Sequence, residues 1–153
     1  MKILAPLRDA AEVEPLLEAG ADEFYCGLTP PGWEERFGSA WANRRNARSA
    51  GVASLADMRR IVELAQGRPV FATLNSPSYP AGAVPQLVAF GRTLLDEVGI
   101  AALIVAEMEL MLALVDEGLA PRLHVSSLAS CRNPGRRPST ASWVWRASCC
   151  RGT

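Results

Sequence analysis

The sequence predicts an α/β fold, a partial TIM-like β/α barrel of about five parallel strands with intervening helices, and three features lead to it. Five short apolar segments alternate with helical patterns, each helical pattern ends at or just before a glycine, and one helix-to-strand junction recurs. Alternating strands and helices are typical of a parallel sheet with right-handed crossovers. Apolar residues make up 49% of the 153 residues and charged residues 21%, which is typical of a packed domain.

The predicted strands are apolar runs without a clean alternation of apolar and polar residues. This pattern is expected when a parallel strand is covered on both faces. The five segments are Lys2–Ala5, Glu23–Cys26, Val70–Leu74, Ala102–Val105 and Leu123–Ser126.

The predicted helices place apolar residues three and four positions apart. They are Ala10–Ala19, Ser54–Gln66, Val84–Val98 and Met108–Glu117, followed by Gly20, Gly67, Gly99 and Gly118. Ser54, three residues before Asp57, forms a variant of the capping box that starts a helix. A glycine directly after a helix favours its termination, because glycine adopts the left-handed conformation of that position without strain.

A repeated junction favours a barrel over an open sheet. The segment Glu18–Tyr25 resembles Glu97–Ile104, and both join the end of a helix to an apolar strand through a glycine. A barrel repeats the same geometry in every unit, so it accounts for the recurrence. A doubly wound open sheet is the alternative, and the GxGxxG motif that would support it does not follow the first strand.

The segment after Asn133 differs from the rest of the chain. Residues 134–153 are rich in Arg, Ser, Cys and Trp and have no periodicity. Back-translating Trp143–Thr153 and regrouping its bases in another frame permits the string LGVARVVLPRH, and extension backwards permits FYRELG. The joined string contains the same glycine junction as Glu18–Tyr25. We therefore predict that residues 1–133 are the N-terminal part of a barrel, truncated by a frameshift, and that residues 134–153 are an out-of-frame, disordered tail.

Composition and charge argue against several classes of function. Lys and Arg number 16, as do Asp and Glu, so no basic excess supports a nucleic-acid surface. No segment has the roughly 20 apolar residues of a membrane-spanning helix, and the N-terminus does not resemble a signal peptide, so we expect a cytoplasmic protein. The four cysteines show no CxxC spacing, and we expect neither a metal site nor a redox pair.

Candidate site residues follow from the barrel, in which the carboxyl ends of the strands and the loops after them form the active site. The long connection Pro30–Ala53 belongs to this face, and long loops there are usually functional. No catalytic residue can be assigned. The predicted substrate-binding residues are Arg8, Asn43, Arg44, Asn75, Glu107 and Ser127, and Cys26 and Ser126 share their location.

Three of these candidates also have a structural interpretation. Arg44 can clamp a carboxylate or phosphate, or it can be a solvated loop residue. Asn75 can bind a ligand or start an Asx turn. Glu107 can act as a general base, or it can be the acidic residue in the first turn of a helix.

The residues that could act as nucleophile or base have weaker support. Ser126 and Ser127 lack a His or Asp at nucleophile-elbow spacing. Cys26 is interpreted as a core residue, because nothing in the sequence indicates an activated thiol. His124, the single histidine, lies in an apolar strand and is interpreted as a buried, hydrogen-bonded residue rather than a catalytic one.

Five motifs occur in collinear order: Ile3–Pro6, Glu18–Gly27, Val70–Asn75, Ala102–Val105 and Leu123–Ser127. In this order they resemble the peptidase U32 family, also called collagenase-like proteases. The resemblance spans residues 1–133. Two positions depart from the family pattern, since Leu7-Arg8 stands where Ala-Gly is common and Leu128 where Gln is common.

The resemblance implies a bacterial cytoplasmic protein with a β/α-barrel N-terminal domain. Members of the family are labelled peptidases, whereas several of them support hydroxylation of RNA bases or of a quinone precursor. Many carry an iron–sulfur cluster on cysteines further along than this chain reaches. No cysteine here matches those ligands, so we expect no cofactor in this chain.

The resemblance leads to three functional hypotheses. The first is a truncated U32 peptidase-like protein, a protease by family label, which is inactive because five strands do not close a barrel of eight. The second is a fragment of a U32-like protein that hydroxylates RNA or a quinone precursor. The third is a non-enzymatic binding or assembly module that self-associates through exposed sheet edges. The expected substrate is accordingly a peptide, an RNA or a small molecule.

Overall fold

The structure, a computed structural model, describes residues 1–38, 41–44 and 51–129 of the chain. The predicted domain boundary after residue 133 and the predicted frameshifted tail lie outside the described residues.

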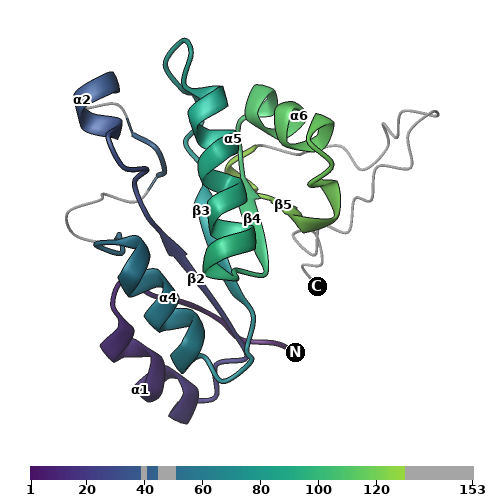
Figure 1. The fold of residues 1–153 in the computed structure, drawn as a ribbon. Coiled ribbons are helices and arrows are strands. Elements are labelled where there is room, and N and C mark those ends of the chain that lie inside the picture. The colour runs from purple at the N-terminus through teal and green to yellow at the C-terminus, as the bar shows by residue number, and fades with distance from the viewer. Residues whose placement is uncertain (39–40, 45–50, 130–153) are drawn as a thin grey trace.

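Five parallel strands form one sheet in chain order (Figure 1). The strands are β1 (Leu4–Pro6), β2 (Glu23–Gly27), β3 (Val70–Leu74), β4 (Ala102–Val105) and β5 (Leu123–Val125). A doubly wound sheet reverses its strand order at a switch point. The sequential order therefore confirms the predicted α/β fold with parallel strands and excludes the doubly wound alternative.

Four main helices connect the strands and lie on one face of the sheet. They are α1 (Val13–Glu18), α4 (Leu55–Leu64), α5 (Val84–Arg92) and α6 (Met108–Asp116). A 3-10 turn, η1 (Ala10–Glu12), precedes α1, and a π-helical segment, η2 (Thr93–Val98), continues α5. Helix α1 contacts α4, α4 contacts η2, and α5 contacts α6, so neighbouring helices lie side by side (Figure 1). Right-handed crossovers between adjacent strands produce this arrangement.

The differences from the predicted elements are confined to ends and short turns. Strand β1 begins at Leu4 rather than Lys2 and extends through Pro6. The sequence does not predict α2 (Trp33–Phe37) within the long connection, because five residues are too short for a periodic pattern. The single-turn elements η3 (Ala120–Arg122) and η4 (Ser127–Ala129) are likewise too short to be predicted from a periodic pattern.

Local signals fix the helix ends as predicted. Ser54 Oγ accepts a hydrogen bond from the Asp57 N–H at 3.1 Å and donates one to the Asp57 carboxylate at 2.6 Å. Gly99 follows η2 with a φ of 85°, and its N–H bonds the Leu94 carbonyl at 3.1 Å. Each helix end in turn sets the residue at which the next strand begins.

The core lies between the sheet and the helix layer. Successive residues of a strand point to opposite faces. The helix-facing residues of β2, β3 and β4, each at most 2% exposed, are Phe24, Cys26, Val70, Ala72, Leu74, Leu103 and Val105. The helix side chains that pack in the same cluster include Met58, Ile61, Leu87, Leu110 and Leu114. This burial supplies the main stabilising term of the fold.

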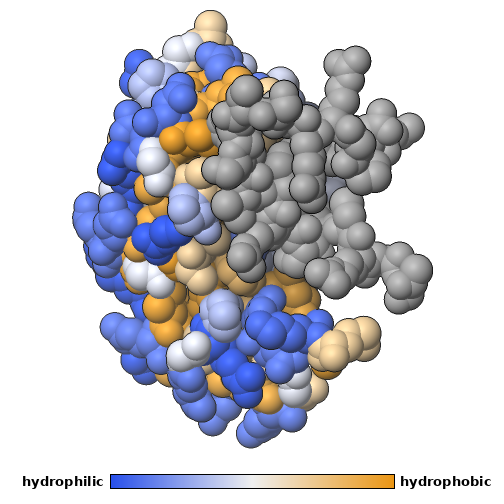
Figure 2. All heavy atoms as spheres, turned by 90° about the vertical axis from the view of Figure 1, so that its right-hand side faces the viewer, coloured by the Kyte–Doolittle hydropathy of each residue, from blue (hydrophilic) through white to orange (hydrophobic). Residues whose placement is uncertain are grey.

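The opposite face of the sheet is covered by none of the four main helices. On β1, Leu4 points to this face and is 44% exposed, whereas Ala5 points to the helices and is 6% exposed. Ile3 and Leu128 are further large apolar residues with exposed side chains. Figure 2 shows apolar residues along the middle of the face that it draws, bordered by hydrophilic residues.

Gly91 lets α5 approach the sheet closely, and this contact yields a stability prediction. A Cβ at position 91 would lie 2.9 Å from Leu103 Cδ1 and 3.5 Å from Leu114 Cδ2. In most helix interiors alanine is more stable than glycine by about 0.5–1 kcal/mol. Here we predict that Gly91→Ala lowers the free energy of unfolding by about 1–3 kcal/mol, because the added methyl overfills a closed core. Urea unfolding measures the change.

The change Leu103→Val provides the control, because it removes the δ carbons that the new methyl would meet. The double variant should lose less stability than the sum of the two single variants. Additive losses, or a Gly91→Ala protein more stable than the wild type, would contradict the close approach.

Candidate functional site

A hollow of about 450 Å³ opens on the face of the sheet opposite the helices and reaches the carboxyl edge. Its volume is in the range of small-molecule and cofactor sites. The lining residues come from all five strands and from the segments that follow β3 and β5. They are Leu4, Tyr25, Thr73, Asn75, Ile104, His124, Val125, Ser126, Ser127 and Leu128.

The floor of the hollow is apolar and aromatic. Tyr25 is opposite Phe71 in the sheet, and Ile104 is opposite both Thr73 and His124. Residues that are opposite one another in adjacent strands point to the same face. The ring centroids of Phe71 and His124 lie 4.8 Å apart with an interplanar angle of 46°. The floor therefore presents the rings of Tyr25 and His124 and the branched aliphatic side chains of Leu4 and Ile104.

The carboxyl edge of the hollow is polar. The Thr73 hydroxyl donates to the Cys26 carbonyl at 3.2 Å, and Ser126 Oγ accepts from the Leu128 N–H at 3.2 Å. Ser127 is exposed. Parallel strands gather such groups because their carboxyl ends meet at one edge of the sheet.

Asn75 joins the loop after β3 to the long connection after β2. Its Oδ1 accepts a hydrogen bond from the Arg44 N–H at 3.0 Å. Asn43 is only 2% exposed, and its Oδ1 lies 3.1 Å from the position that a Cβ on Gly27 would occupy. Gly27 thus leaves room for the Asn43 amide. The backbone of Asn43 and Arg44 is thereby brought to the edge of the hollow.

Tyr79 holds the same connection through a second bond. Its hydroxyl donates to the Ala42 carbonyl at 3.0 Å, and its ring meets the buried Trp33 ring edge-on at 6.3 Å. Burial raises the pKa of the Tyr79 hydroxyl well above its ordinary value, so this donor stays protonated. Trp33 therefore anchors the loop, whereas Trp41 is 57% exposed.

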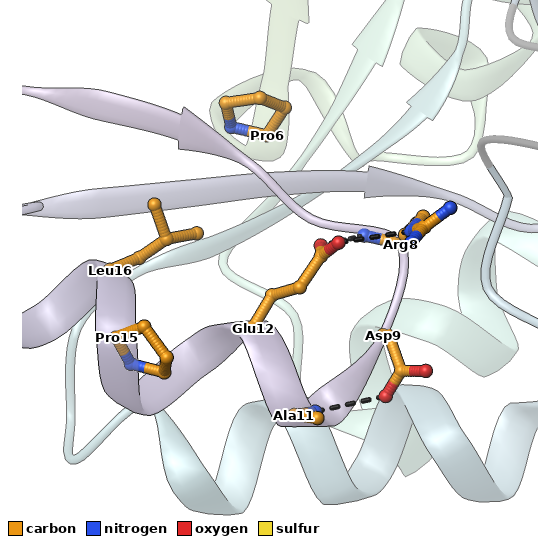
Figure 3. A pocket seen from close by; sticks show the side chains of 7 residues that line it. All are labelled: Pro6, Arg8, Asp9, Ala11, Glu12, Pro15 and Leu16. Atoms are coloured by element: carbon orange, nitrogen blue, oxygen red, sulfur yellow. Dashed lines mark hydrogen bonds and ion pairs between the residues drawn. The ribbon is translucent and has the colours of Figure 1, made fainter.

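Arg8 lies beside a separate recess of about 500 Å³ (Figure 3). Its Nε is 3.0 Å from Glu12 Oε1, and its backbone N–H donates to the other oxygen of that carboxylate at 3.0 Å. In Figure 3, Glu12 points toward Arg8, while the Asp9 side chain bonds the Ala11 N–H. The predicted residue Arg8 is therefore not brought together with the residues of the hollow.

Two other candidate residues stabilise the helix layer and its contact with the sheet. Glu107 is the N-cap of α6, where its two carboxylate oxygens accept from the Glu109 N–H at 2.9 Å and the Leu110 N–H at 2.7 Å. Cys26 is completely buried, with its Sγ 3.9 Å from the Phe71 carbonyl oxygen. Both side chains have structural roles in this arrangement.

His124 differs from the interpretation made from sequence. The sequence treats it as buried and hydrogen-bonded, but the structure places it partly exposed in the lining of the hollow. Partial burial lowers the pKa of His124 below its ordinary value, and the Glu23 carboxylate opposes this effect. The imidazole is therefore uncharged at neutral pH.

Sequence reasoning locates the edge of the hollow but not its floor. Asn75 and Ser127 line the hollow, and Asn43 and Arg44 adjoin it through Asn75. The floor residues are missed, because the apolar pattern of a buried parallel strand does not reveal which face stays open.

Residues 1–38, 41–44 and 51–129, which the structure describes, contain neither a metal-binding cluster nor a membrane-spanning helix. No group of three His, Cys, Asp or Glu side chains there could hold a metal ion. No helix there combines the length and the apolar character that crossing a bilayer requires. Cys26, inside the core, does not fit an iron–sulfur ligand, and the other three cysteines lie outside the described residues.

Fold and site together define an α/β protein with five parallel strands in chain order and a candidate ligand site at the carboxyl edge of its sheet. The family model for peptidase family U32 matches residues 8–140. The chain therefore belongs to peptidase family U32. A comparison with curated proteins gives no match.

A solved structure, "The Structure of the U32 Peptidase Mk0906", is similar to this chain with a TM-score of 0.59 and 17% sequence identity. The similarity covers 84% of this chain and 49% of that one, so this chain spans about half the length of the solved protein. At this identity the likeness bears on the fold alone.

The bond between Asn75 and Arg44 yields a prediction about the loops. Asn75→Ala removes the acceptor, which should cost about 1 kcal/mol and speed amide exchange at Arg44 about fivefold. Asn75→Asp is the control, because a carboxylate oxygen accepts the same bond. Hydrogen exchange followed by NMR measures both, and equal Arg44 exchange in the wild type and Asn75→Ala would disprove the link.

The environment of His124 predicts a pH dependence of stability. The folded pKa lies below the unfolded value of about 6.5. The stabilising contribution is therefore complete above about pH 6.5 and is lost as the pH falls through that value toward the folded pKa. His124→Asn should flatten the stability curve below neutrality. Urea titrations between about pH 5 and pH 8 check this, and parallel curves for the two proteins would refute it.

Proposed function

We propose that this chain supplies the substrate-binding wall of a U32 peptidase and that the substrate is a peptide. The observation that carries the proposal is the hollow of about 450 Å³ at the carboxyl edge of the parallel sheet. In barrels of this type the active site lies at that edge. Membership of a peptidase family supports a peptide as the ligand.

The edge of the hollow suits a peptide backbone. An extended peptide presents one N–H and one C=O per residue, and each needs a partner when water is displaced. Asn75 and Ser127 both line the hollow and carry amide and hydroxyl groups that donate and accept. The uncharged floor suits the side chain of a bound residue.

Cleavage of a peptide bond needs an activated nucleophile or water and donors for the developing oxyanion. In the lining, Ser126, Ser127 and His124 have side chains of that chemistry. Ser126 is only 6% exposed, and its Oγ already accepts from the Leu128 N–H. The role proposed for the described residues is therefore the binding of a peptide.

A second candidate function is the hydroxylation of an RNA base or a quinone precursor. The observation in its favour is the pair of flat rings in the lining, Tyr25 and His124, which suit a planar ligand. An RNA ligand also needs cations for its phosphates. Within the described part of the chain, the lining contains no Lys or Arg, and Arg44 adjoins it without lining it, so a peptide remains the proposed substrate.

Fluorescence anisotropy with a labelled, unstructured peptide derived from gelatin tests the proposal. Ser127→Trp places a bulky side chain at the exposed rim of the hollow and should weaken binding at least about tenfold. Leu112→Trp, at a site 47% exposed on α6, adds similar bulk outside the hollow and should leave binding unchanged. Mass spectrometry of the same samples reports any cleavage.

The proposed function would be contradicted if the wild type did not bind the peptide, or if the two tryptophan variants lost peptide affinity equally. Near-ultraviolet circular dichroism of each variant establishes that its tertiary packing is retained.

A further inference from the structure

We propose that the hollow is an aromatic-selective subsite, in which an uncharged aromatic side chain of the peptide lies beside the His124 ring. The inference rests on the proposed function and names the residue class that the site would accept. The shape and the charge of the lining support it.

Four strands together shape the floor for a flat group. Leu4 comes from β1, Tyr25 from β2, Ile104 from β4 and His124 from β5. The His124 ring is supported from below by Phe71, at 4.8 Å between centroids. Aromatic rings prefer offset or edge-to-face contacts with other rings over contacts with water. A planar side chain therefore gains more on this floor than a small aliphatic one.

The charge of the lining rejects ionised side chains. Among the residues that the structure describes, the lining includes no Lys, Arg, Asp or Glu. A charged group that loses hydrating water at such a site without gaining a partner is destabilised. The lowered pKa of His124 keeps the imidazole neutral at pH 7, so it provides no counter-charge.

The carboxylate that acts on the pKa of His124, that of Glu23, is already paired with a lysine. Glu23 lies at the amino end of β2, where its Oε1 is 2.6 Å from Lys2 Nζ. Its carboxylate is thus partly neutralised at the opposite edge of the sheet from Asn75 and Ser127. A Lys or Arg side chain of the substrate finds no unmatched acid in the lining.

The polar edge fixes the direction in which a residue would enter. Asn75 and Ser127 stand at the carboxyl edge, and the rings of Tyr25 and His124 stand further toward the middle of the sheet. A peptide backbone that bonds the edge therefore directs one side chain onto the floor. Selection for an aromatic residue follows from this placement together with the uncharged character of the described lining residues.

NMR of the imidazole tests the inference directly, because His124 is the single histidine of the chain. The probes are N-acetylphenylalaninamide, N-acetylalaninamide, N-acetyllysinamide and uridine, each titrated into the full chain. The phenylalanine probe should shift the His124 ring signals saturably, with a Kd at least about tenfold below those of the alanine and lysine probes. Tyr25→Leu should weaken the phenylalanine probe at least about fivefold, and Leu112→Ala on the outer face of α6 should not.

Three outcomes would overturn the inference. They are no His124 shift with the phenylalanine probe, equal binding of the lysine probe, and uridine binding as tightly as phenylalanine, which would indicate a nucleobase site instead. The readout needs no cleavage and no long peptide. A His124 shift without gelatin-peptide binding would therefore support the aromatic subsite but contradict the proposed function. Binding of the gelatin peptide without a His124 shift would support the proposed function but contradict the aromatic subsite.

Discussion

Right-handed crossovers between strands that are neighbours in both chain and sheet force every helix onto the same face. In this protein the strand order runs from β1 to β5 without reversal, so α1, α4, α5 and α6 form one layer. That layer buries Phe24, Leu74 and Leu103 almost completely. On the other face, Leu4 is exposed and Tyr25, Ile104 and His124 are partly exposed, and the hollow opens among them. Phe71 and Thr73 point to the same face but are buried. Site and core are therefore two consequences of one topological constraint.

The same constraint explains why residues far apart in the chain meet at one edge. All five strands point the same way, so the segments after β2, β3 and β5 emerge together. Asn75 and Tyr79 then fasten the long connection by bonds to the Arg44 N–H and the Ala42 carbonyl. These are bonds to backbone atoms, so they fix the path of the loop whatever its side chains do. A site at an edge whose loops are held by such hydrogen bonds is better ordered than a site on unsupported loops.

Sequence patterns predict the buried parts of this fold well and its open parts poorly. The strands Val70–Leu74 and Ala102–Val105 match their predicted bounds, because the interior strands are apolar on both faces. The helix ends follow because Ser54 caps and Gly99 adopts a positive φ, and both are local effects. The role of His124 depends instead on which face of the sheet stays open. That is a property of the assembled sheet and leaves no mark in a single strand.

The predicted site residues fall into two groups, those that line the hollow and those that pair with groups nearby in the chain. Location after a strand correctly places Asn75 and Ser127 at the hollow. The same rule also selects Arg8 and Glu107, but nearby partners engage both side chains. Glu12, four residues along, pairs with Arg8, and the first turn of α6 takes both oxygens of Glu107. A rule based on strand ends does not predict these pairings, because the partner groups lie in the turn that follows the strand.

The open face is the claim on which this account most depends, and paired cysteine substitutions on β4 test it most directly. Ile104 and Leu103 are neighbours in sequence that point to opposite faces of the sheet. Alkylation of Ile104→Cys and Leu103→Cys in the native protein, followed by peptide mass mapping, measures the accessibility of each. The account predicts rapid modification at position 104 and protection at position 103 until the protein unfolds. Equal protection of both, or faster modification at 103, would contradict it.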